Sequence, residues 1–146
     1  MKRVVIAMAL GSILWFACEP VDTATEADAK IMGDTTKYTT IQWLDTLVNF
    51  APVNKGEQVK VTFRFRNTGN QPLIVASVRA ACGCTVPDYT KGAVAPGGEG
   101  IVTGAFDSNK SAAGEVRKSI FVTTNTKNKT RQTLIFTGLV NEAVKK

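Results

Sequence analysis

The clearest segment of the chain is Val59-Lys60-Val61-Thr62-Phe63-Arg64-Phe65-Arg66. Valine or phenylalanine occupies every second position, and lysine, threonine or arginine occupies the positions between them. Because successive side chains of a strand point to opposite faces, this alternation predicts an antiparallel strand with one buried and one solvated face. The turn-forming stretch at 67–72, Asn-Thr-Gly-Asn-Gln-Pro, ends the strand.

Similar short segments recur on both sides of this strand, each bounded by turn residues. None of them keeps a helical period over ten or more residues. About seven short strands with turns every ten residues or so are typical of an all-β, immunoglobulin-like β-sandwich, and a small closed barrel is the alternative. The expected strands are 38–43, 48–51, 59–66, 73–78, 100–106, 117–124 and 132–140.

The composition argues against an enzyme. The chain has 146 residues, 44% of them hydrophobic, and no histidine. Without histidine, Ser–His and Cys–His nucleophilic sites, histidine-ligated zinc and imidazole acid–base catalysis are excluded. We therefore expect one globular domain that acts as a binding or scaffolding protein and needs no cofactor.

The first 17 residues resemble a bacterial export signal. A basic start is followed by an apolar run over residues 4–16, which is too short to span a bilayer as a helix. The run ends at Ala17-Cys18, which predicts a lipoprotein signal: residues 1–17 are removed, and Cys18 is acylated and anchors the protein in the membrane. Ordinary signal-peptidase cleavage, which would leave Cys18 unmodified, is the alternative.

The remainder divides by charge into a tether and a domain. Residues 18–36 carry five acidic residues and one lysine, and their lack of apolar periodicity predicts a disordered acidic tether. Residues 37–146 carry fifteen Lys or Arg and seven Asp or Glu, a formal charge of +8. Such a domain suits an acidic protein or a glycan. No nucleic-acid partner is expected, because no recognition-helix or stacking-aromatic pattern is present. The expected location is the envelope of a diderm bacterium, on its periplasmic or surface face.

Residues 81–87 read Ala-Cys-Gly-Cys-Thr-Val-Pro, and four further stretches accompany them: 63–69, 71–73, 94–98 and 121–126. Together they resemble the bacterial family known as domain of unknown function 1573 (DUF1573), from about Gln42 to Val140. The resemblance implies an immunoglobulin-like domain similar to ciliary and major-sperm-protein scaffolding modules. It also implies a secreted or lipid-anchored protein without catalytic activity.

Cys82 and Cys84 remain when Cys18 is assigned to the signal. In an extended strand their Cα atoms would lie roughly 7 Å apart, at the limit for a disulfide, although Gly83 permits a tighter backbone. Three roles stay open: a structural brace, either as thiols or as a local bridge; a labile redox bridge; and two thiolates that hold Cu(I). Tetrahedral zinc would need two more ligands.

The polar face of the first strand carries a basic stripe of Lys60, Arg64 and Arg66. Such a stripe is a candidate contact for an anion or an acidic partner. A solvated sheet surface is the competing interpretation.

Overall fold

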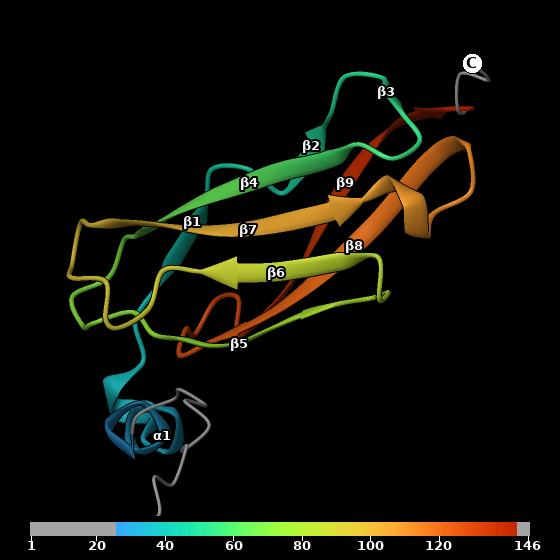
Figure 1. The fold of residues 1–146 in the computed structure, drawn as a ribbon. Coiled ribbons are helices and arrows are strands. Elements are labelled where there is room, and N and C mark those ends of the chain that lie inside the picture. Colours follow the sequence, from blue (N-terminus) through green and yellow to red (C-terminus); the bar gives the residue numbers. More distant parts are fainter. Residues whose placement is uncertain (1–25, 143–146) are drawn as a thin grey trace, which may run out of the picture.

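The computed structural model describes residues 26–142, which form nine strands, one α-helix and two 3-10 helices (Figure 1). The helical elements are α1 (Glu26–Gly33), η1 (Thr35–Lys37) and η2 (Ser108–Lys110). The strands are β1 (Ile41–Trp43), β2 (Leu47–Asn49), β3 (Val53–Asn54), β4 (Gln58–Asn67), β5 (Val75–Ala80), β6 (Thr85–Tyr89), β7 (Glu99–Asp107), β8 (Gly114–Thr124) and β9 (Arg131–Asn141).

The strands form two sheets that pack face to face (Figure 1). Sheet I has the order β1-β4-β7-β6, and sheet II has the order β2-β9-β8-β5, with β3 also paired to β9. The prediction of an immunoglobulin-like sandwich is confirmed, since the two separate sheets exclude a closed barrel among the described residues. This arrangement leaves each sheet one outer face.

Strand β4 follows the alternation expected from its sequence. Its inward positions from Val61 to Phe65 are buried, whereas Lys60, Thr62 and Arg64 on the other face are exposed. Facing side chains of sheet II complete the core, with the rings of Phe106 and Phe136 at 5.6 Å between centroids. Burial of this apolar stripe, which contributes roughly 25 cal/mol per Å², holds β4 in register.

Two features of the sheets differ from the sequence prediction. Strands β2 and β3 run parallel to β9, so the sandwich is not wholly antiparallel. Strand β6 was not predicted, because Pro87 and Asp88 are poor strand formers. It forms as the edge strand of sheet I, where a proline is tolerated since only one side of the strand must pair.

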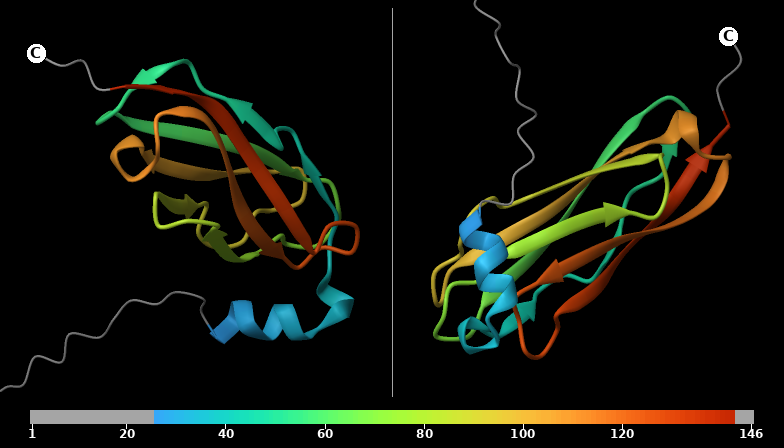
Figure 2. Two further views of the ribbon diagram at one scale, coloured as in Figure 1. Left: turned by 90° about the vertical axis from the view of Figure 1, so that its right-hand side faces the viewer. Right: turned by 90° about the horizontal axis from the view of Figure 1, so that it is seen from below.

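The segment predicted as a disordered tether contains regular structure in its described part. Residues 26–33 form α1, whose sequence of good helix formers ends at Gly33. The helix contacts β5 and lies outside the sandwich, on the β5 side (Figure 2). The hydroxyl of Tyr38 donates a hydrogen bond to the carbonyl of Met32 at 3.1 Å. A tether prediction for residues 26–36 therefore missed a helix that tertiary contacts hold in place.

No helix within residues 26–142 is long and apolar enough to cross a bilayer. The predicted signal segment and Cys18 lie outside the described residues, so their assignment stays a prediction.

Candidate functional site

The cysteine pair forms a disulfide in the turn between β5 and β6. The Cα atoms of Cys82 and Cys84 lie 5.2 Å apart, closer than an extended strand would allow, because the backbone turns between them. Gly83 has no positive φ, and a Cβ placed on it would meet nothing within 4 Å. The turn therefore does not depend on glycine's conformational freedom, contrary to the reason that the sequence suggested.

The two ends of the bridge differ in exposure. Cys84 is 5% exposed and belongs to the hydrophobic core, whereas Cys82 is half-buried against it. The carbonyl of Cys84 accepts a hydrogen bond from the amide of Asp107 at 2.9 Å, and the amide of Ala81 donates to the carbonyl of Ser119 at 2.9 Å. The bridge thus spans the place where the chain passes from sheet II to sheet I.

The basic stripe on β4 is largely neutralised by neighbouring carboxylates. Arg64 pairs with Asp45 at 2.7 Å, and Arg66 pairs with Glu99 at 2.5 Å. The hydrogen bond from Arg64 lowers the pKa of Asp45 and raises that of Arg64 itself. Lys60 is exposed on the same face. This pairing weakens the stripe as an anion site, because its arginines already have partners.

Sheet II has the opposite character on its outer face. Three arginines project there, Arg79 from β5, Arg117 from β8 and Arg131 from β9, and none of them is in an ion pair within residues 26–142. Strands β8 and β9 contain one acidic residue, Glu115, which is exposed. The described ion pairs instead join residues of sheet I and its connecting segments: Arg64–Asp45, Arg66–Glu99, Lys91–Asp88 and Lys110–Asp107.

Exposed apolar side chains lie among these arginines. Phe121 is 50% exposed on β8, Leu139 is 40% exposed on β9, and Leu47 is 60% exposed on β2. All three point to the outer face, because successive side chains of a strand alternate and the residues next to them in sequence point to the core: Val48, Ile120, Val122 and Val140. An uncovered ring and leucines beside unpaired cations are typical of a contact surface.

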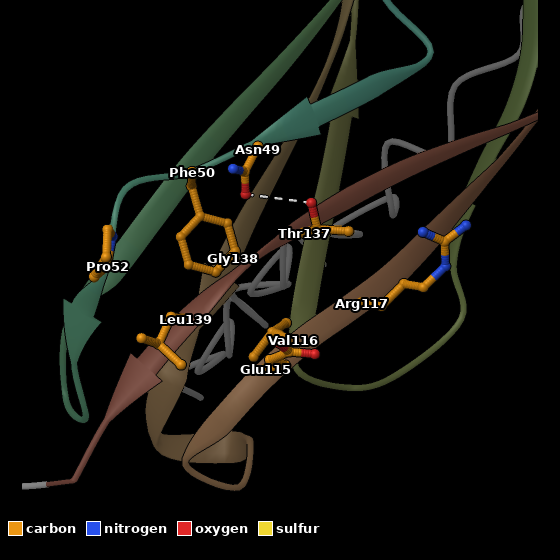
Figure 3. Close-up of a pocket in the computed structure, with 9 residues that line it drawn as sticks. All are labelled: Asn49, Phe50, Pro52, Glu115, Val116, Arg117, Thr137, Gly138 and Leu139. Atoms are coloured by element: carbon orange, nitrogen blue, oxygen red, sulfur yellow. Dashed lines mark hydrogen bonds between the residues drawn. The ribbon is translucent and has the colours of Figure 1, made fainter.

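Two hollows indent this face. One, of about 600 Å³, is lined by residues of β9, of β8 and of the end of β2 with the segment after it, and Figure 3 shows the ring of Phe50 beside Gly138, with Leu139 and Pro52 nearby. Thr137 donates a hydrogen bond to the side-chain oxygen of Asn49 at 3.3 Å at the rim (Figure 3). The second hollow, of about 500 Å³, surrounds Phe121.

Sequence reasoning missed the outer face of sheet II. Residues 120–122 are all apolar, so their sequence does not predict which side chains are buried and which are exposed. One signal was present, because Val116, Ile120 and Val122 share one alternation and leave Phe121 on the other side of the strand. The neighbours of Phe121 were not predictable, since Arg79 and Arg131 reach it only through strand pairing.

No group of three or more His, Cys, Asp or Glu side chains within the described residues is arranged to hold a metal ion. The carboxylate of Asp88 is held at a lowered pKa by the amide of Tyr89 and the ammonium group of Lys91, which is a local surface arrangement. Asp88 and Lys91 both lie on the exposed surface and line neither of the two hollows.

Comparisons with solved structures find the same architecture elsewhere. A protein of unknown function from Porphyromonas gingivalis W83 is 16% identical, with a TM-score of 0.63 over 73% of this chain and 49% of that one. The PapD-like domain 7 of human CEP192 is 12% identical, with a TM-score of 0.57 over 94% and 99% of the two chains. The CsuC–CsuE chaperone–tip adhesion subunit complex of Acinetobacter baumannii Csu pili is 12% identical, with a TM-score of 0.51 over 69% of this chain and 57% of that one.

Identities this low show the fold alone, and this chain spans about half of the Porphyromonas gingivalis protein. A search of curated proteins finds no significant match. A family profile described as "Protein of unknown function (DUF1573)" matches residues 41–140, most of the chain. The family resemblance expected from the sequence is thereby confirmed, and the protein belongs to the DUF1573 family.

Proposed function

We propose that this protein is a non-catalytic, lipid-anchored binding or scaffolding module of the bacterial cell envelope. Cys18 is the proposed acylated residue, and the sandwich is the part that meets a partner. The observation that carries the proposal is the outer face of sheet II, where unpaired arginines surround exposed apolar side chains. The immunoglobulin-like fold, shared with a PapD-like domain and with a pilus chaperone complex, supports a role in binding.

The other outer face is a weaker candidate for the contact. On sheet I the arginines of β4 are engaged by Asp45 and Glu99, so a ligand would have to displace an existing carboxylate. Arginines that lack such a partner can form two parallel hydrogen bonds with an incoming carboxylate at no such cost. A partner rich in acidic groups therefore suits sheet II.

The packing of the cysteine pair favours a structural brace over the alternative function, thiol redox or copper handling. Cu(I) binds thiolates, and a disulfide offers none. A redox partner must also reach a sulfur, and it could approach only from the side of the half-buried Cys82, because the side chain of Cys84 is buried in the core. Titration of free thiols in the purified protein, before and after incubation with a mild thiol reductant, tests this choice: we expect none in either case, whereas two free thiols in the exported protein, or two after mild reduction, would restore the alternative.

Cell fractionation and site-specific photocrosslinking test the main proposal. We expect the protein in the membrane fraction with a triacylated Cys18, and the Cys18→Ser variant in the soluble fraction. A photocrosslinking residue at Phe121, on sheet II, should give discrete adducts in intact cells. The matched control is the same residue at Val86, which is 67% exposed on sheet I. An unmodified Cys18, or equal adducts at both positions, would contradict the proposal.

A further inference from the structure

The hollow around Phe121 combines an aromatic ring with two guanidinium groups. Phe121 on β8 stands directly opposite Arg79 on β5 and Thr133 on β9. In the next row along the sheet, Thr123 on β8 stands between Ser77 and Arg131. The ring therefore lies at the centre of a small polar platform, with one arginine on each side of it. We call these six residues the Phe121 platform.

Spacing in a sheet sets how far apart the two arginines stand. Arg79 and Arg131 are separated by two strand intervals and one row, which corresponds to about 12 Å between their Cα atoms. Both are exposed and outside any ion pair among residues 26–142. Their guanidinium groups can therefore hold two carboxylates that lie on either side of a group stacked on the ring.

The backbone around the platform excludes one class of ligand. Strand β8 is hydrogen-bonded on one side to β5 and on the other to β9, so its amides and carbonyls are engaged. A peptide could not pair with β8 as an extra strand, because that mode of binding needs a free edge. The free edge of sheet II is the outer side of β5, and a strand added there would lie beyond Arg79, two strand intervals from the ring of Phe121. The ligand must instead be recognised by side chains: an aromatic face, hydroxyl groups and guanidinium groups.

We propose that the Phe121 platform binds an acidic saccharide, with a sugar ring stacked on Phe121 and uronate carboxylates held by Arg79 and Arg131. The apolar C–H face of a pyranose matches an exposed aromatic ring, and its hydroxyls match the side chains of Ser77, Thr123 and Thr133. The volume of the hollow, about 500 Å³, is within the range of small-ligand sites. This inference rests on the proposed function, since it names the ligand class of the same face.

Calorimetric titration of the full-length protein in detergent tests the proposal. The probes are tetragalacturonate, its methyl ester, which has the same rings without charge, and tetraglutamate, which has the charge without rings. We expect tetragalacturonate to bind at least about tenfold more tightly than either of the others, because loss of charged hydrogen bonds or of stacking costs that much. Binding should weaken as NaCl is raised.

Two variants locate the site, and a third controls for net charge. Arg79→Gln/Arg131→Gln and Phe121→Thr should each weaken binding of tetragalacturonate at least about tenfold. Arg64→Gln/Arg66→Gln removes the same charge from sheet I and should change binding less than about twofold. If Phe121→Thr fails to fold, Phe121→Tyr, which keeps the ring, should fold and bind like the natural protein.

Three results would overturn the inference. Equal losses in the two double variants would show general attraction by a basic domain. Tetraglutamate binding as tightly as tetragalacturonate would show an acidic peptide site. No binding of tetragalacturonate at millimolar concentration would remove the site altogether. In that last case, adducts at position 121 in cells would still support the proposed function, whereas a soluble protein that binds the saccharide would refute only the anchor.

Discussion

Asn67 lies fully buried at the end of β4, and all of its side-chain hydrogen-bonding groups have partners. Its amide nitrogen donates to the carbonyls of Gln71 at 2.8 Å and Val94 at 2.9 Å. Its oxygen accepts from the hydroxyl of Thr39 at 2.8 Å and from the amide of Gly69 at 3.1 Å. One side chain therefore joins the turn after β4 to two distant segments.

Replacing Asn67 should destabilise the domain strongly. We expect Asn67→Ala to lower the free energy of unfolding by about 3 kcal/mol, because several buried polar groups lose their partners at once. Asn70, exposed in the same turn, is the matched control, and Asn70→Ala should cost less than about 0.5 kcal/mol. Urea unfolding measures both. Similar losses in the two variants would contradict a specific role for the buried side chain.

Alanine should destabilise the domain at one glycine, Gly138, and have no effect at another, Gly83. A Cβ on Gly138 would collide with the ring of Phe50, whereas a Cβ on Gly83 would meet nothing within 4 Å. We expect Gly138→Ala to cost about 1–3 kcal/mol by overpacking. Gly83→Ala should leave both stability and the disulfide unchanged, since Gly83 has no positive φ. Thermal unfolding of the two variants checks this, and a large loss in Gly83→Ala would mean that the cysteine turn needs a glycine.

At the scale of elements, the disulfide lies within the turn that connects the end of β5 at Ala80 to the start of β6 at Thr85. The loop it closes is very short, with a sequence separation of two, so it constrains the unfolded chain only modestly. The chain-entropy estimate for such a loop is about 1.5 kcal/mol. Burial of Cys84 adds to its contribution, because the side chain packs in the core.

Removing the bridge should weaken the domain without unfolding it. We expect Cys82→Ala/Cys84→Ala to lower the free energy of unfolding by about 2 kcal/mol, from the lost constraint and the lost packing. Urea unfolding with and without reductant measures this. The reduced natural protein should lose a similar amount, and the double variant should be insensitive to reductant. A reduced protein as stable as the oxidised one would argue against a structural role for the bridge.

At the scale of the whole molecule, one ion pair fixes the segment that connects the two sheets to a strand of sheet I. Asp45 lies between β1 of sheet I and β2 of sheet II, and its carboxylate accepts a hydrogen bond from Arg64 on β4 at 2.7 Å. The amides of Leu44 and Asp45 also donate to the carbonyl of Arg64. This crossing point is where the first strand leaves one sheet for the other.

The pH dependence of stability should reflect this pair. The hydrogen bond from Arg64 lowers the pKa of Asp45 in the folded state, so its contribution is present above the unfolded pKa, near 4, and is lost as the pH falls through the folded value. Asp45→Asn should therefore show a smaller loss of stability below pH 4 than the natural protein. Urea midpoints measured between pH 7 and pH 2.5 check this, and parallel pH profiles would contradict it.

Alternation along the chain was enough to predict the class of fold and most of the strands. Strand β4 shows why: a period of two with bulky apolar residues allows only one face to be buried, and that constraint is local. The pair at positions 82 and 84 was likewise visible as the main candidate for cysteine chemistry. These predictions depend on neighbours in the sequence, which the chain itself specifies.

Packing and pairing decided the rest. Whether Cys82 and Cys84 are bridged, and whether Arg64 is free, depends on a turn and on an aspartate nineteen residues away. Helix α1, with eight residues, is too short to be stable alone, and strand β6 contains poor strand formers, so both need tertiary contacts. The Phe121 platform is drawn from three strands, and its members become neighbours only when the sheet fixes their register, because no local pattern encodes which strands lie side by side.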